Sequence, residues 1–237
     1  MILEEMTMKE FKRGMRKTRT LAVPYGTVEA HGEHLPLNTD TLVIREVLKK
    51  VSEETPLFVA PPVYYGVCTS TGRHPGTIGV TPATLRMLTK DIVRDASGKG
   101  FKRFILISGH GGSLHVSAMK EAAEALTVEL KGAVIAALSI YEVLGPEANL
   151  IAETENDSHA GEMETSAVLY LAPELVKGRS KEEYPGLPKP IVARDKMKYW
   201  PGAVWGDPSK ATAEKGLRLF DLMVRKVTGL VKKIERF

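Results

Sequence analysis

The apolar residues of this chain gather in short continuous runs instead of alternating with polar ones. Four runs have the length of strands: LAVPYG (21–26), FVAPPV (58–63), RFILIS (103–108) and AVIAALSI (133–140). A strand that is apolar on both faces is typical of a parallel sheet covered by helices on both sides. The sequence therefore predicts buried parallel strands at these four places.

Helical patterns lie between the runs. They predict helices over 40–53, from 81, over 113–130, over 163–171, and from about Asp207-Pro208 to the C-terminus. In the second of these, Thr81 has the place of an N-cap and Pro82 that of the first helical residue. The predicted inward positions of the second and last helices are Leu85, Leu88 and Ile92, and Leu217, Phe220, Val224 and Leu230. The Pro-rich stretch 184–190 is expected to be a loop.

Strands that alternate with helices indicate a layered α/β fold with a mostly parallel sheet. In such folds the active site lies beyond the carboxyl ends of the strands, in loops that lead into helices. The chain has 237 residues, 43% hydrophobic and 26% charged, which predicts one globular domain over residues 1–237. We therefore expect the catalytic residues in the loops that follow the strands.

Composition excludes several classes of protein. Cys68 is the single cysteine, so an internal disulfide and a cysteine-rich zinc site are excluded. There is no apolar run of membrane-spanning length and no secretory leader at the N-terminus, so we expect a cytoplasmic protein without a membrane partner. The net charge of +4 comes from interspersed acids and bases. This pattern argues against nucleic acid as a partner, yet it favours an anionic small substrate. The absence of glutamine is typical of hyperthermophile proteins.

The first polar cluster, GTVEAHGEHLPLNTD (26–40), follows the first strand. Glu29 and His31 are two residues apart, so an extended backbone would point both to the same side. Asp40 stands where the next helix should begin. Two plainer interpretations stay open, in which Asp40 is only a helix cap and Glu29 a solvated loop acid.

The second cluster, SGHGGS (108–113), follows the run RFILI directly. His110 is flanked by glycines that leave the backbone open to a ligand. The helix that follows would present the N–H groups of Gly111, Gly112 and Ser113 to an anion. The alternative is a glycine-rich turn with an incidental histidine.

The third cluster, DSHAGEMETS (157–166), contains His159, Glu162 and Glu164 at the start of a predicted helix. Acids in a first helical turn are common because of the helix dipole alone. The three clusters nevertheless hold four of the six histidines. Histidine and carboxylate ligands suit zinc, iron(II) or manganese, and a bridging carboxylate indicates two metals about 3.5–4 Å apart.

A glycine-rich loop, GVCTSTGRHPGT (66–77), follows the second strand. We interpret it as a substrate loop that includes Ser70, Arg73 and His74, with Arg73 as a contact for an anion. No base is paired with Cys68, so an inert cysteine is favoured over a nucleophile. Trp200 and Trp205 are either packing residues or an aromatic cover over a flat ring.

These motifs together resemble the creatininase family, also called creatinine amidohydrolases. The matching segments are EAHGEHLPLNTD (29–40), HPGT (74–77), GHGG (109–112), HAGEMETS (159–166) and WGDPSKAT (205–212). The resemblance implies a three-layer α/β/α fold and a two-metal centre that hydrolyses C–N bonds of amides. It implies that Glu29 and His110 bind one metal, that His31 binds the other, and that Asp40 bridges them. It also implies a homo-oligomer.

Two positions depart from that family. Creatinine-hydrolysing members have a glutamate ligand two residues after the histidine that matches His110, where this chain has Gly112. We therefore expect Glu164 to complete the second metal site, with Glu162 as the alternative. The Gly-His-Gly-Gly motif is usually followed by asparagine, and here by Ser113.

Within the family, the chain resembles most the archaeal deformylases of formamidopyrimidine ribonucleotides in riboflavin and deazaflavin biosynthesis. This resemblance predicts release of formate from an anionic nucleotide, with iron(II) or zinc as the metals and manganese as a further possibility. His159 would protonate the leaving amine, Glu164 would bind metal or act as a base, and the amides at 111–113 would stabilise the oxyanion. The alternatives are hydrolysis of creatinine, another cyclic amide or a peptide, or a metal-binding protein that is catalytically silent.

Overall fold

A computed structural model describes all residues, 1–237, and its centre is a four-stranded parallel sheet. The strands are β1 (Thr20–Tyr25), β2 (Phe58–Val59), β3 (Arg103–Ser108) and β4 (Val134–Ser139), in the order β2-β1-β3-β4. The helices are α1 (Met8–Gly14), α2 (Thr39–Glu54), α3 (Pro82–Gly98), α4 (Ser113–Glu129), α5 (Ile140–Leu144), α6 (Glu162–Leu171) and α7 (Ala213–Ile234). The predicted parallel α/β fold is confirmed.

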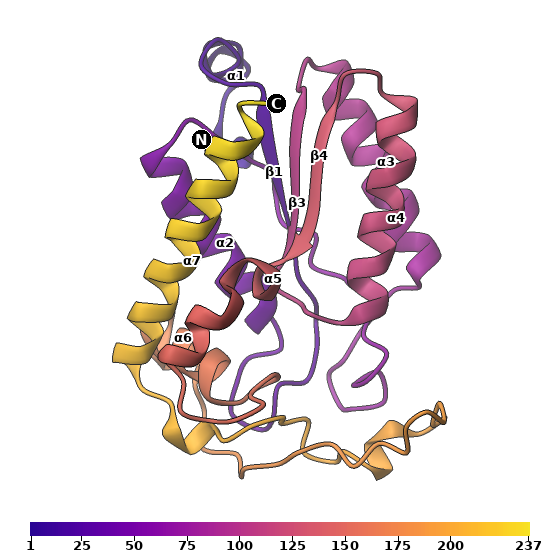
Figure 1. The fold of residues 1–237 in the computed structure, drawn as a ribbon, viewed down its shortest axis with the longest axis vertical. Helices are drawn as coiled ribbons and strands as arrows, with labels where there is room; N and C mark the ends of the chain where they lie inside the picture. The colour runs from indigo at the N-terminus through magenta and orange to yellow at the C-terminus, as the bar shows by residue number, and fades with distance from the viewer.

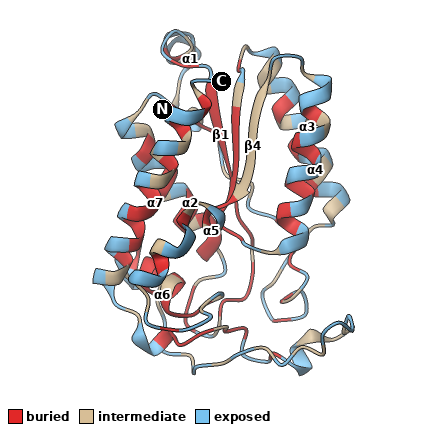
Figure 2. Ribbon diagram, viewed as in Figure 1, coloured by how far each residue is buried: buried red, intermediate tan, exposed pale blue.

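Helices cover both faces of the sheet. In Figure 1, α2 and α7 lie on one side of the strands and α3 and α4 on the other. Each side has its own apolar core, because alternate residues of a strand point to opposite faces. Ala22 and Ile105 pack toward α2 and α7, whereas Val23 and Leu106 pack toward α3 and α4. Figure 2 shows the buried residues concentrated along these inner surfaces.

The carboxyl ends of three strands meet at one edge of the sheet. Tyr25 of β1 pairs with Ser108 of β3, which in turn pairs with Ser139 of β4. The loops that leave these residues therefore begin side by side. The long connection from α6 to α7, residues 172–212, runs below this edge in Figure 1 and closes the region from the opposite side.

Several predicted boundaries were wrong. The second strand ends at Val59 because Pro61 and Pro62 have no N–H to donate to a neighbouring strand. The fourth strand ends at Ser139, whose side chain and Glu142 form a capping box that starts α5. Near Pro208 there is only a short 3₁₀ turn, and α7 begins at Ala213.

Two predicted inward leucines point outward. Leu88 of α3 is 41% exposed and Leu217 of α7 is 40% exposed. On α3 the buried residues are Leu85, Thr89 and Val93, so a threonine takes the place that apolar spacing gave to Leu88. The helix Met8–Gly14 was not predicted, although Thr7 and Glu10 form a capping box at its start. No helix has the length and apolar character needed to cross a bilayer.

Candidate metal centre

Five histidine and carboxylate side chains from three separate parts of the chain meet beyond the strand ends. They are Glu29, His31, Asp40, His110 and Glu164, and each is at most 7% exposed. Glu29 and His31 follow β1, Asp40 lies in the first turn of α2, His110 follows β3, and Glu164 lies in the first turn of α6. The structure thus brings together all five metal ligands expected from the sequence.

Asp40 lies between two histidines. Its Oδ1 is 3.3 Å from Nε2 of His31, and its Oδ2 is 3.2 Å from Nδ1 of His110. Nδ1 of His110 is also 2.9 Å from Oε2 of Glu29. This close approach requires Gly109, because a Cβ at that position would lie 2.1 Å from the carbonyl oxygen of Asp40. The carboxylate of Asp40 therefore faces both halves of the cluster, one with His31 and the other with Glu29 and His110.

Glu164 completes the half that contains His31. Its Oε2 is 3.6 Å from Nε2 of His31 and accepts the N–H of Ala160 at 2.6 Å. Ala160 has a φ of 49°, the left-handed region, which is disfavoured for alanine. Glu162, the alternative ligand, points elsewhere, because its carboxylate pairs with Lys215 at 2.6 Å and accepts the N–H of Thr154.

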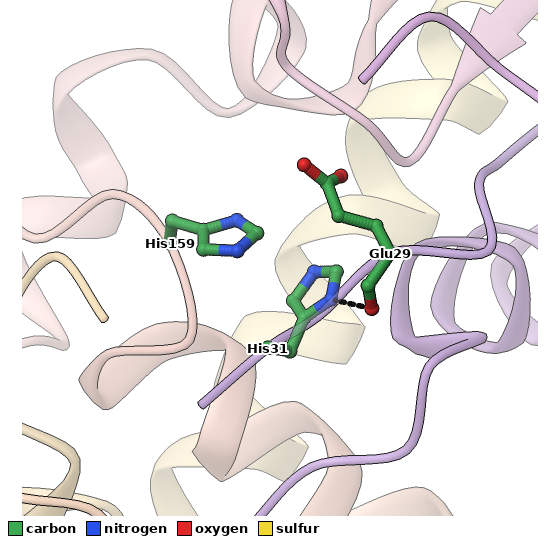
Figure 3. Close-up of side chains that lie close together, drawn as sticks. All are labelled: Glu29, His31 and His159. Carbon is green, nitrogen blue, oxygen red and sulfur yellow. Dashed lines mark hydrogen bonds between the residues drawn. The ribbon is translucent and has the colours of Figure 1, made fainter. Parts of the chain in front are cut away.

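Hydrogen bonds orient the cluster from outside. The Nδ1–H of His31 donates to the carbonyl of Glu29 at 3.0 Å (Figure 3), which turns Nε2 of the ring toward Asp40. The hydroxyl of Thr27 donates to Asp40, and that of Thr71 donates to Glu29. Bonds of this kind fix the ring orientation and basicity of metal ligands.

The electrostatics of the cluster favour bound cations. Burial by itself would lower the pKa of His31, but Asp40, Glu164 and Glu29 outweigh it and raise the pKa to about 10. Burial would raise the pKa of Glu29, yet His110 and then His159 lower it to about 2. Buried carboxylates need a compensating cation. The ion-pair partners of Glu29, Asp40 and Glu164 are histidines alone.

This donor set fits divalent metal ions. His31, Asp40 and Glu164 place their ligand atoms within 4.8 Å of one another, as do Glu29, His31 and His159. Nitrogen and carboxylate ligands without a thiolate suit zinc, iron(II) or manganese. Metal cations would neutralise the three carboxylates without protonating His31 and His110. The cluster is therefore suitable for metal binding.

His159 lies at the edge of the cluster. Its ring stacks on that of His31 with centroids 4.2 Å apart (Figure 3), and its Nε2–H donates to the carbonyl of Ala30 at 2.9 Å. Burial, and then the neighbouring His31, lowers the pKa of His159. The ring is therefore neutral near pH 7, with Nδ1 as an acceptor.

A cavity of about 580 Å³ opens over the cluster. Glu29, His110, His159 and Glu164 lie in its lining. The predicted substrate-binding residues that also line it are Ser70, Gly111, Gly112 and Ser113. Its volume is that of a typical site for a small organic ligand. Trp200 and Trp205 form part of its wall, with ring centroids 6.4 Å apart.

Arg73 and His74, which the sequence predicts to contact substrate, lie outside the lining of this cavity. The side chain of Arg73 is 55% exposed and 4.0 Å from Asp195. His74 is buried, and its Nε2 lies 2.6 Å from the carbonyl oxygen of Trp200, so it ties two loops together. The one lysine or arginine in the lining of the cavity is Lys189, whose Nζ lies 5.9 Å from the ring centroid of Trp205.

Other residues of the motifs have supporting positions. The ring nitrogens of His34 contact the hydroxyls of Ser180 and Thr165, each at 2.8 Å. Cys68 is buried within 4.8 Å of ligand atoms of Glu29 and His110. Burial, together with the negative Glu29 and Asp40, raises the pKa of the Cys68 thiol, which opposes a nucleophilic thiolate.

Sequence reasoning missed Thr27, Thr71, Tyr141 and Lys189. Thr27 lies two residues after β1 and Tyr141 two residues after β4, as His110 does after β3, so the strand-end rule that found His110 could have found both. Nothing in the sequence distinguishes Lys189 from the other basic residues of the loop 172–212. Its place becomes visible only when that loop is folded over the cavity.

Comparison with known proteins agrees with this geometry. Residues 4–231 match the model of the family described as creatininase, creatinine amidohydrolase. The mycofactocin precursor peptide peptidase of Mycolicibacterium smegmatis is 33% identical over 89% of this chain and 83% of its own length. The creatinine amidohydrolase of Pseudomonas putida is 27% identical over 97% of this chain and 95% of its own.

Solved structures show the same fold. A crystal structure of creatinine amidohydrolase superposes with a TM-score of 0.84 at 25% identity, covering 98% of this chain and 96% of that one. Two further creatininases, a manganese form and a mutant of Zn–Zn type, also give a TM-score of 0.84 at 25% identity, with 98% and 97% of the two chains covered.

Proposed function

This chain belongs to the creatininase family, and from that premise we propose that it hydrolyses an amide C–N bond at a centre of two divalent metals. The observation that carries the proposal is the position of Asp40, whose two oxygens face His31 and His110 separately. Glu29 and His110 would hold one metal, and His31 and Glu164 the other. Zinc, iron(II) and manganese all suit these ligands.

Metals bound here would lower the pKa of water toward neutrality and polarise the carbonyl of the substrate. The residues of the chain supply the remaining steps. His159 accepts a proton at Nδ1, because its Nε2–H is held by the carbonyl of Ala30. It then returns this proton to the nitrogen that leaves, which restores the starting tautomer.

The start of α4 provides donors for the oxyanion. The first helical bond runs from the N–H of Val116 to the carbonyl of Gly112, so the amides of Gly112 and Ser113 have no partner within the helix. Both residues line the cavity beside His110. They can therefore stabilise negative charge that develops on the carbonyl oxygen.

For the substrate, we propose a formamide on a pyrimidine ribonucleotide, with release of formate. Three features support a flat, anionic molecule larger than creatinine: the cavity of about 580 Å³, the wall of Trp200 and Trp205, and Lys189 at its side. The test is formate release by the metal-loaded protein from the formamidopyrimidine nucleotide, with creatinine as the comparison. Turnover of creatinine without formate release would exclude deformylation and leave amide hydrolysis standing.

Peptide hydrolysis is the second candidate. It is favoured by the similarity to mycobacterial proteins described as mycofactocin precursor peptide peptidases, of which the first is 33% identical. A panel of short peptides assayed for new amino groups separates this activity from deformylation.

We also propose that the protein forms a homo-oligomer, whose mass sedimentation velocity would measure, and that it is located in the cytoplasm.

A further inference from the structure

We infer that Tyr141 is the residue that positions Glu164 as a metal ligand, and so sets the affinity of the second metal site. The inference rests on the proposed two-metal centre. Its starting point is Gly112, which leaves no carboxylate two residues after His110. The second site therefore depends on Glu164, whose side chain comes from the first turn of α6.

Two donors hold the carboxylate of Glu164. The hydroxyl of Tyr141 donates to Oε1, and the N–H of Ala160 donates to Oε2 at 2.6 Å. With one oxygen held on each side, the carboxylate cannot rotate freely. Oε2, 3.6 Å from Nε2 of His31, is then the oxygen directed at the second site.

The ring of Tyr141 is itself fixed by its surroundings. Tyr141 is the second residue of α5, which starts directly after β4 with a capping box between Ser139 and Glu142. Its ring lies against Gly111, where an added Cβ would be 3.1 Å from Cδ2. Gly111 thus leaves room for a tyrosine that reaches Glu164 from the start of α5.

The experiment uses the full chain stripped of metal with a chelator and titrated with Zn²⁺ against a chromophoric competitor. Tyr141→Phe keeps the ring and removes the hydroxyl. We expect the second Zn²⁺ to bind about 10–100-fold more weakly, which is usual when an outer hydrogen bond to a ligand is removed. The first Zn²⁺, held by Glu29 and His110, should bind as in the unaltered protein. His31→Ala identifies which of the two binding steps belongs to the second site.

Two further variants make the test specific. Tyr170 lies on the same helix as Glu164, and its ring packs on Phe220 outside the cluster. Tyr170→Phe removes its hydroxyl and should change neither Zn²⁺ affinity. Glu164→Gln should weaken the second site by itself, and adding Tyr141→Phe to it should cause no further loss, because the hydroxyl acts through that carboxylate.

The outcomes separate this inference from the two-metal proposal. If the unaltered protein binds two Zn²⁺ and Tyr141→Phe binds them with the same affinities, the positioning role is overturned and the metal centre stands. Additive losses in the double variant would also overturn it. If the unaltered protein binds fewer than two Zn²⁺, the two-metal proposal fails, and the inference fails with it.

Discussion

His31 and His159 stack with their ring centroids 4.2 Å apart, and each ring donates one N–H to a backbone carbonyl, of Glu29 and Ala30 respectively. The other ring nitrogen of His31, Nε2, lies 3.3 Å from Oδ1 of Asp40, whereas His159 lies at the margin, where the cavity opens. Two adjacent imidazoles are thus given different surroundings. This difference predicts different roles, as ligand and as proton carrier.

His159→Ala should keep both metals and slow turnover by about 10²–10⁴-fold, the usual contribution of a proton donor or acceptor. Metal content by elemental analysis and kcat on the same preparation check this. Loss of one metal in His159→Ala would show that His159 is a metal ligand. The geometry allows this, because the ligand atoms of His159, Glu29 and His31 lie within 4.8 Å of one another.

Asp40→Ala should lose both metals, because both halves of the cluster share this carboxylate. His31→Ala should lose only the metal that it shares with Glu164, so the two variants form a matched pair. Both are measured as bound metal per chain after dialysis. An Asp40→Ala protein that retained two metals would refute the bridging role.

The fold of this chain could be predicted from its sequence because the buried parts of parallel strands are continuous apolar runs, as FILI (104–107) in β3 shows. The metal cluster was readable for a related reason, since Glu29, His31 and His110 follow strands whose carboxyl ends must share one edge. The wrongly predicted ends of the second and fourth strands are set by local backbone and side-chain hydrogen bonding. Pro61 cannot donate to a ladder, and the capping box of Ser139 and Glu142 starts a helix where apolar residues continue.

The position of Arg73 relative to the cavity could not be predicted from the sequence. A motif places its residues in sequence but does not say which side chains of a loop turn inward. In the loop 66–77, Ser70 lines the cavity while Arg73 extends into solvent toward Asp195. Lys189 comes from the loop 172–212, far along the chain from Gly112 and Ser113, and no local pattern connects it with them.

His115 should make the protein less stable as the pH falls. Burial, and then the neighbouring His110, lowers the pKa of His115 to about 3, from an ordinary value of 6.5. The folded ring stays neutral because Nδ1 accepts the N–H of Val67 at 3.1 Å. Below pH 6.5 His115 binds a proton in the unfolded chain but stays neutral in the folded chain. The free energy of unfolding is therefore highest above pH 6.5 and falls as the pH drops toward 3, by up to about 1.4 kcal/mol per pH unit.

Urea unfolding of the metal-free protein at pH 7 and pH 5 measures this slope. His115→Gln retains an acceptor for Val67 but cannot take up a proton. It should be less stable at pH 7 and should lose less stability between the two pH values than the unaltered protein does. Equal losses would show that the pH dependence arises from other groups.

Lys189 should bind the anionic part of the substrate. Lys189 is the one lysine or arginine in the lining of the cavity, where its Nζ lies near the ring of Trp205. Lys189→Met removes the charge and keeps an apolar stem over that ring. A hydrogen bond to a charged group contributes roughly 1.5–3 kcal/mol, so kcat/KM for a phosphorylated substrate should fall about 10–100-fold. With the dephosphorylated substrate kcat/KM should hardly change.

Arg73→Gln is the matched control. Because Arg73 lies outside the cavity, this variant should leave kcat/KM for both substrates unchanged. A loss with Arg73→Gln and none with Lys189→Met would mean that the loop 66–77 closes over the substrate, and that the anion is held there instead.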